Sequence, residues 1–376
     1  MENMTGMVKG GDDAGHERGH DDAAEVRRMN AHAETDAGML VLPQPYLLFV
    51  GDTRERGYAK TAFGLRDWAG DKCVGECASD AAAVTTGLPR MTPAEGAARG
   101  ARALVIAVAN KGGFIPLGWR ATLIEALGAG LDIVSGMHAR LRDIAELAEA
   151  ADRLGRRLID VRTPPPGLTV ATGAKRSGKR LLTVGTDCAL GKKYTALALA
   201  RAFVERGIDA DFRASGQTGI MIAGAGMPMD AVIADFEAGA AEQLSPDAAP
   251  DHWDVIEGQG SLAHPAYAAV SLGLLHGSQP DVFVLCHEPG RTELLGMTGF
   301  DVPSVDDMIA LTITLGRRTN PAIRCGGLSF NTGALSADEA ERVMATESAR
   351  TGLPVADPMR GGPAFDRLVD ACLRGA

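Results

Sequence analysis

A glycine-rich loop that could bind phosphate is the stretch of this sequence with the clearest chemistry. Residues 181–195 read LLTVGTDCALGKKYT, in which a strand-forming run ends at Gly185 and a helical run begins at Gly191 and Lys192. A strand that enters a helix through such a loop directs backbone N–H groups and the positive end of the helix dipole at an anion. The sequence therefore predicts a phosphate-binding loop, with Lys192 placed to contact a phosphate oxygen of a nucleotide or of coenzyme A.

The residue after Lys192 departs from the usual form of this motif, G-x-x-x-x-G-K-[ST]. Five residues separate the glycines, and Lys193 stands where a Ser or Thr hydroxyl would coordinate Mg²⁺ in enzymes that act on Mg-nucleotides. A protonated lysine cannot ligate Mg²⁺, and Thr195 lies roughly 200° further around a helix. This pattern favours a loop that binds diphosphate by charge, unless Lys193 points to solvent and another group holds the metal.

An acidic residue after a later strand is the first candidate for a general base. The strand-like run 253–256 ends in Glu257, followed by GQGS, so its carboxylate is expected in the crevice beside the phosphate loop. There it could accept a proton, or it could only cap the loop that follows. His264 lies in the same segment and is the competing base, with a structural hydrogen-bonding role as its alternative.

These residues are spaced along alternating strands and helices, which predict an α/β fold. We expect two doubly wound, mainly parallel-sheet domains at 41–162 and 180–376, joined by a Pro-rich, polar linker at 163–179. Sites on such sheets lie at the carboxyl ends of the strands. In the first domain the loops at that edge are 51–60, 110–119 and 135–140. In the second domain, the segment SGQTGIMIAGAGMPMD from Ser215 to Asp230 is expected to be a loop.

Composition excludes several classes of protein. The chain has 376 residues, 45% of them hydrophobic, and a net charge of −10, which argues against a nucleic-acid partner. No apolar run approaches the roughly 18 residues of a membrane-spanning helix, so we expect a cytoplasmic protein with no membrane partner. The expected partner is a small-molecule substrate. Residues 1–40 are rich in charged residues, His and Gly and are expected to form a flexible extension. The six cysteines are scattered, and no metal site is predicted.

Taken together, the motifs resemble those of a known bacterial family. The loop is similar to that of dethiobiotin-synthetase-type P-loop proteins. The span from about 41 to 376 resembles a family long described as a domain of unknown function, whose best-described members are DgcN-type D-glutamate N-acetyltransferases. The segments that carry the resemblance are LGAGLDIVSGMH, GTDCALGKKYTA, RASGQTGIMI, EGQGSLAHPAY and GLSFNTG.

This resemblance implies a Rossmann-like domain followed by a P-loop NTPase-like domain, and a homodimer. It also implies transfer of an acetyl group from acetyl-CoA to the amine of an acidic amino acid, D-glutamate. Acetyl-CoA would be held by the loop and by an Asn-Thr turn near the C-terminus, through Gly185, Thr186, Asp187, Gly191, Lys192, Lys193, Tyr194 and Asn331. For Asn331 the alternative is an ordinary turn.

The carboxylates of an acidic amino acid would need arginine or other hydrogen-bond donors. Candidates in loops at the expected edges of the sheets are Arg213, Ser215, Gln217, Arg291, Lys111 and His138. Arg213 and Arg291 could instead form surface ion pairs. Catalysis would then fall to Glu257 or His264, with Lys192 holding the cofactor, and the substrate amine would attack the thioester directly.

Two other functions are compatible with the same residues. A Mg-ATP-dependent ligase or kinase of dethiobiotin-synthetase type would hydrolyse nucleotide, which Lys193 should impair. A non-catalytic nucleotide or CoA sensor would bind its ligand without turnover. Within the acetyltransferase interpretation, Cys188 in the loop is the alternative nucleophile, which would carry the acetyl group as a covalent intermediate.

Overall fold

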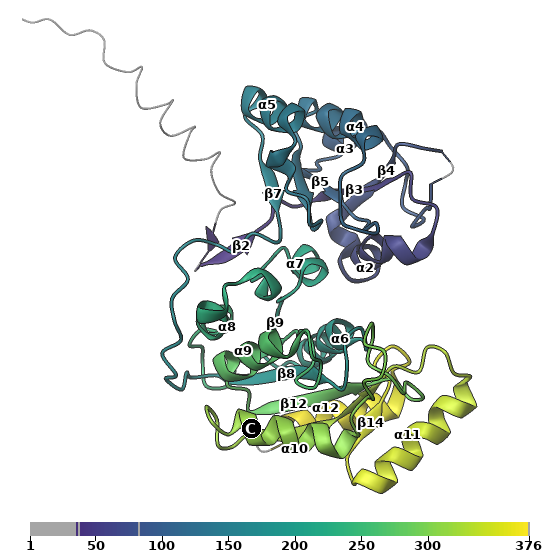
Figure 1. The fold of residues 1–376 in the computed structure, drawn as a ribbon. Coiled ribbons are helices and arrows are strands. Elements are labelled where there is room, and N and C mark those ends of the chain that lie inside the picture. Colours follow the sequence, from purple (N-terminus) through teal and green to yellow (C-terminus); the bar gives the residue numbers. More distant parts are fainter. Residues whose placement is uncertain (1–34, 37, 82, 375–376) are drawn as a thin grey trace, which may run out of the picture.

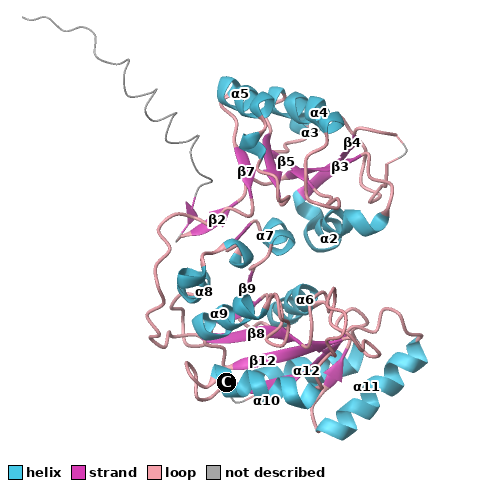
Figure 2. Ribbon diagram, viewed as in Figure 1, coloured by secondary structure: helices cyan, strands magenta, loops and turns pink. Residues whose placement is uncertain are grey.

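The computed structural model describes residues 35–36, 38–81 and 83–374, and these form two parallel-sheet domains (Figures 1 and 2). Most of the expected N-terminal extension lies outside the described residues. In its described part, β1 (Thr35–Asp36) and β2 (Met39–Val41) pair as antiparallel strands.

The first domain is a five-stranded parallel sheet with the strand order β4-β3-β5-β6-β7. Its strands are β3 (Tyr46–Gly51), β4 (Cys73–Ala78), β5 (Ala103–Ile106), β6 (Asp132–Ser135) and β7 (Leu158–Asp160). Its helices are α2 (Lys60–Ala69), α3 (Pro93–Ala98), α4 (Leu117–Gly128) and α5 (Ala145–Leu154). Every residue of β3 and β5 is buried, which explains why these strands are unbroken apolar runs rather than alternating patterns.

The second domain is a six-stranded parallel sheet with the order β14-β13-β12-β8-β11-β9. Its strands are β8 (Lys179–Gly185), β9 (Ala210–Arg213), β11 (Trp253–Ile256), β12 (Val282–His287), β13 (Arg324–Phe330) and β14 (Val355–Ala356). The helices around it are α6 (Lys192–Glu205), α8 (Glu237–Leu244), α9 (Ala268–Ser278), α10 (Val305–Gly316), α11 (Ala337–Thr351) and α12 (Gly362–Leu373). The expected fold class, two doubly wound parallel-sheet domains, is confirmed.

One segment expected to be a loop is a helix instead. Within Ser215–Asp230, residues Gln217–Ala223 form α7, which lies between the two sheets and packs against α2 (Figure 1). The side chains of Ile220, Met221 and Ile222 are buried in the hydrophobic core of the first domain. Seven residues flanked by glycines show no helical periodicity, so this helix depends on contacts with the other domain, which a local pattern does not reveal.

The two domains are joined by several contacts around α7. Strand β2 pairs with β10 (Ala225–Gly226) of the second domain. The hydroxyl oxygens of Thr61 and Thr218 lie 3.1 Å apart, and Lys72 Nζ donates to the Ala223 carbonyl oxygen at 3.3 Å. A helix of the second domain thus completes the hydrophobic core of the first domain, and this packing fixes the interface between them.

The segment expected to be a linker contains no helix or strand between residues 161 and 178 but is firmly attached to the second domain. Arg176 donates to the carbonyl oxygens of Ser245 and Gly277, and the Thr172 hydroxyl lies 3.1 Å from the Glu242 carboxylate. The fully buried Arg180, at the start of β8, donates to several further carbonyl oxygens of this region.

Among the described residues, no helix is both long enough and apolar enough to cross a membrane.

A close approach of the linker to α8 gives a test of this packing. A Cβ atom added at Gly239 would lie 1.8 Å from the Thr169 carbonyl oxygen. We expect Gly239→Ala to lower the free energy of unfolding by about 1–3 kcal/mol, because the linker backbone must move away. Gly118→Ala in α4, where no atom lies within 4 Å of the new Cβ, should not lower it. Equal urea midpoints for the two variants would contradict this packing.

Candidate functional site

A cavity of about 630 Å³ opens at the carboxyl ends of β8, β11 and β13. The glycine-rich loop, the start of α7 and the residues after β11 line it, together with residues 329–331 and 357–359. One residue of the first domain, Lys60, also reaches its wall. A cavity of this size suits a small-molecule ligand.

The glycine-rich loop presents a row of free amide groups to this cavity. Among the hydrogen bonds of the described residues, none of the amides from Ala189 to Lys193 has a protein acceptor. Ala189 and Gly191 adopt left-handed backbone conformations, with φ of 55° and 99°. Successive amides in such a turn form a concave anion site, and the N-terminus of α6 adds its dipole.

Lys192 lies beneath the loop rather than in solvent. Its side chain is buried, and Nζ donates to the Asp187 carbonyl oxygen at 2.8 Å. Burial lowers the pKa of this ammonium group. Gly258 leaves the necessary room, because a Cβ there would lie 3.2 Å from Lys192 Cδ and 1.7 Å from the Thr183 carbonyl oxygen.

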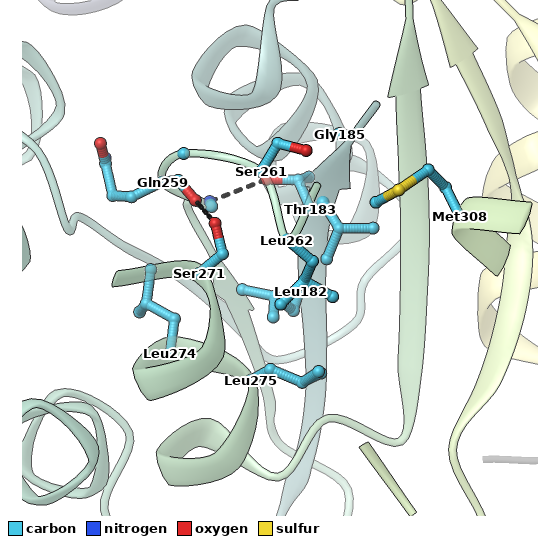
Figure 3. Close-up of a pocket in the computed structure, with 13 residues that line it drawn as sticks. Leu182, Thr183, Gly185, Gln259, Ser261, Leu262, Ser271, Leu274, Leu275 and Met308 are labelled. Atoms are coloured by element: carbon cyan, nitrogen blue, oxygen red, sulfur yellow. Dashed lines mark hydrogen bonds between the residues drawn. The ribbon is translucent and has the colours of Figure 1, made fainter. Parts of the chain in front are cut away.

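The loop after β11 is fixed against β8 and α9, as Figure 3 shows. The Gly258 amide donates to the Thr183 hydroxyl at 2.9 Å, and the Ser271 hydroxyl donates to the Gln259 carbonyl oxygen at 2.6 Å. Leu182, Leu274, Leu275 and Met308 surround a small apolar pocket below it (Figure 3). The residue that precedes this loop, Glu257, is therefore held in a defined position.

Glu257 is a buried acid that lines the cavity. One carboxylate oxygen, Oε2, accepts the amides of Ser215 and Gly216 at 3.0 and 3.1 Å, where α7 begins. The other, Oε1, has no hydrogen-bond partner among the described residues. Burial raises the pKa of Glu257, and although Lys193 and the two amides oppose this effect, the pKa stays above its usual value. The raised pKa makes the ionised Glu257 carboxylate a stronger base than an exposed glutamate.

Thr186 and Asp187 support the loop from behind. The Asp187 carboxylate is fully buried and accepts from Arg291 Nη1 at 2.7 Å, from the Leu295 amide at 2.8 Å and from the Cys188 amide. Burial alone would raise the pKa of Asp187, but these donors, Arg291 first, hold it below its usual value. The Thr186 hydroxyl lies 3.0 Å from His287 Nδ1. Neither side chain lines the cavity.

His264, the competing base, is fully buried, and both of its ring nitrogens are in use. Nε2 lies 3.2 Å from the Leu295 carbonyl oxygen, and Nδ1 accepts the Ala266 amide at 3.1 Å. Ligand atoms of Asp187, Cys188 and His264 lie within 4.8 Å of one another. Because the oxygens of Asp187 and the nitrogens of His264 already have partners in the protein, this cluster serves to hold the loops together.

The two candidate arginines are both engaged in ion pairs. Arg213 Nε lies 2.5 Å from Asp254 and Nη2 lies 3.2 Å from Asp211, while Arg291 binds Asp187 and Glu288. Neither lines the cavity, so the ion-pair alternative describes their geometry. Lys111 and His138 are exposed in loops of the first domain and also lie outside its lining.

Three of the remaining candidates lie at or beside the cavity. Gln217 lines it and donates to Asp230 at 2.7 Å. Asn331 lines it too, with its side-chain oxygen 3.3 Å from the Gly333 amide, as in a turn. Ser215 is buried behind it, and its hydroxyl donates to the Glu257 carbonyl oxygen at 2.5 Å.

Comparison with known proteins agrees with this architecture. A P-loop domain of unknown function, DUF1611, matches residues 169–369, and the Rossmann-like N-terminal domain of the same family matches residues 71–164. The chain belongs to the DUF1611 family. It is similar to a D-glutamate N-acetyltransferase of Tritonibacter scottomollicae, with 48% identity over 88% of this chain and 99% of that protein. A second D-glutamate N-acetyltransferase, from a Pseudoalteromonas species, is 46% identical over 85% of this chain and 96% of its own length.

A solved structure shares the whole two-domain arrangement. The crystal structure of a DUF1611 family protein from Anabaena variabilis matches with a TM-score of 0.76 and 33% identity. The match covers 88% of this chain and 100% of that one.

The first domain of this DUF1611 chain has its switch point, between β3 and β5, filled by a side chain. The indole of Trp119 packs edge-on against Phe49 at 5.4 Å and donates to Asp52 at 2.8 Å. A Cβ at Gly51 would lie 2.5 Å from this ring. An open sheet of this kind usually binds its ligand at that crevice. Here the first domain instead contributes Lys60 to the lining of the cavity in the second domain. The sequence placed Lys60 in an edge loop without assigning it a role.

The Asp187–Arg291 pair gives a stability test of the loop. Asp187→Asn keeps the size of the side chain but leaves the Arg291 charge and one amide poorly paired, so we expect a loss of about 3 kcal/mol in the free energy of unfolding. The pKa of Asp187 is lower in the native state than in the unfolded state, where it is about 3.9. Above that pH the ionised carboxylate therefore adds to the free energy of unfolding. That stability is lost as the pH falls through the native value. The difference from the wild type should therefore be full at pH 7 and shrink below about pH 4. A difference that does not depend on pH would contradict the role of the pair.

Proposed function

We propose that this protein transfers the acetyl group of acetyl-CoA to the amino group of D-glutamate. The proposal rests on Glu257, which lines the cavity of the phosphate loop and has a raised pKa. Its carboxylate oxygen Oε1 has no hydrogen-bond partner among the described residues. The names of the two relatives supply the reaction and the substrate.

The loop suits the diphosphate of coenzyme A. Its free amides, the dipole of α6 and the charge of Lys192 all favour an anion. Lys193 replaces the hydroxyl that would bind Mg²⁺. Thr195, the nearest hydroxyl on the helix, lies 2.7 Å from the Ser329 hydroxyl. These residues support our proposal that the loop binds the diphosphate by charge without a metal ion.

Glu257 would act as the general base of a direct transfer. It takes one proton from the substrate ammonium, and the freed amine attacks the thioester carbonyl carbon. When the C–S bond breaks, the leaving sulfur takes up the amine's second proton and departs as the CoA thiol. Hydrogen-bond donors near the thioester, other than the loop amides that hold the diphosphate, would stabilise the developing negative charge on the carbonyl oxygen.

Cys188 fits this direct route better than a covalent one. Burial raises the pKa of its thiol above the usual value, so it is protonated at neutral pH. A protonated thiol is a weak nucleophile.

An assay of thiol and phosphate release tests the proposal against its alternatives. Purified protein is incubated with acetyl-CoA or Mg-ATP, and with D- or L-glutamate. We expect thiol release with acetyl-CoA and D-glutamate. Phosphate release without thiol release would indicate the ligase or kinase, and ligand binding without either product would indicate the sensor.

The homodimer and the cytoplasmic location stay predictions. Light scattering would measure the oligomeric state.

Replacement of the base should reduce turnover strongly. Glu257→Gln can still accept the two amides at the start of α7 but cannot take a proton, so we expect kcat to fall by about 10²–10⁴-fold. In the wild type kcat/KM should fall as the pH drops through the raised pKa, because the carboxylate becomes protonated, and the variant should lack this limb. Glu205→Gln, exposed at the far end of α6, is the matched control. Unchanged kcat in Glu257→Gln would exclude this base.

A further inference from the structure

The cavity contains two ammonium groups without a hydrogen bond or ion pair among the described residues. Lys60 comes from the first domain and Lys193 from the second, and both line the cavity. Lys193 Nζ lies 4.4 Å from the centre of the Tyr194 ring, its one close contact of this kind. By contrast, Lys192 donates to Asp187, and the two candidate arginines are held by carboxylates outside the cavity.

The positions of these lysines are unfavourable for the helices that carry them. Lys60 is the first residue of α2, and Lys193 is the second residue of α6. The positive end of a helix dipole disfavours a cation at its N-terminus. Neither lysine therefore serves to stabilise its helix, and an anion in the cavity would offset both the charges and the dipoles.

The two loop lysines have different electrostatic surroundings. Lys192 lies among Cys286, Cys188, Asp187 and Arg291, all at the base of the loop. Lys193 lies near Glu257 and Lys60: burial lowers the pKa of Lys193, Glu257 raises it, and Lys60 lowers it further. Lys192 is thus surrounded by groups at the base of the loop, whereas the charged neighbours of Lys193 include the proposed general base Glu257.

Among the acids that line the cavity in the described part of the chain, one carboxylate oxygen has no hydrogen-bond partner. Asp230 binds Arg162 and Gln217, and Asp357 accepts the Thr332 hydroxyl. Glu257 uses one oxygen on the amides of α7 and keeps Oε1 available. Two free cations and one free anion complement an amino acid with two carboxylates and one ammonium group.

We propose that Lys193 binds the α-carboxylate of the acidic amino acid, Lys60 binds its side-chain carboxylate, and Glu257 holds its ammonium group. This inference rests on the proposed function and assigns the substrate residues that the arginines do not supply. The α-carboxylate is assigned to Lys193 because it lies next to the amine, and Lys193 and Glu257 line the same cavity and interact electrostatically. Substrate then bridges the two domains, and the first domain selects for the acidic side chain.

A comparison of D-glutamate with D-glutamine tests the assignment of Lys60, because the two differ only at the side-chain terminus. In Lys60→Met we expect KM for D-glutamate to rise at least about 10-fold and KM for acetyl-CoA to stay within about twofold. The kcat/KM for D-glutamine should stay within about twofold of the wild type, so the preference for D-glutamate is lost. Lys60→Arg should restore most of it, since it keeps the charge.

Lys193→Met should weaken both amino acids together, because both carry an α-carboxylate, and should leave KM for acetyl-CoA within about twofold. Lys175→Met is the control for loss of one positive charge, since Lys175 pairs with Asp281 at the opposite edge of the sheet. Its kinetic constants should match the wild type.

Two results separate failure of this inference from failure of the proposed function. An active wild type in which Lys60→Met alters D-glutamate and D-glutamine equally, or alters only acetyl-CoA, would overturn the assignment of Lys60. A wild type that releases no thiol with any amino acid would overturn the proposed function and with it the inference. Because Lys60 is exposed, its variants should unfold at the wild-type temperature, and their kinetics then report on binding.

Discussion

The hydrogen bonds between the Glu257 carboxylate and the amides that begin α7 are the contacts on which the site depends. They join the strand that carries the acid to the helix that completes the core of the other domain. A Cβ at Gly219 would lie 2.1 Å from Glu257 Oε2, so glycine at that position lets the carboxylate rest against the helix. The position of the acid and the arrangement of the domains are therefore fixed together, with one carboxylate oxygen left for chemistry.

Positive charge is divided along the glycine-rich loop. Buried Lys192 and the free amides belong to the anion site that we propose, while Lys193 and Glu257 line the same cavity. In an Mg-nucleotide enzyme the second position would bear a hydroxyl for the metal. A lysine there removes the metal ligand, which is why we propose that the loop binds an anion by charge.

The sequence predicted what local patterns determine. Apolar runs predicted β3, β8 and β11, and the glycine-rich motif predicted the loop, because these depend on neighbouring residues. Helix α7 could not be predicted in this way, since its apolar residues are buried by the other domain. The partners of Arg213 and Arg291 depend on tertiary contacts, which are not visible in a sequence. Lys60 was in an expected edge loop, but only the packing of the domains brings it to the cavity.

We propose that the loop binds the diphosphate of coenzyme A by charge alone. This is tested by isothermal titration of the wild-type protein with coenzyme A and with ATP, each in Mg²⁺ and in chelator. We predict that coenzyme A binds with the same Kd in both solutions and that ATP gains nothing from Mg²⁺. Binding of ATP that requires Mg²⁺, without binding of coenzyme A, would contradict the claim.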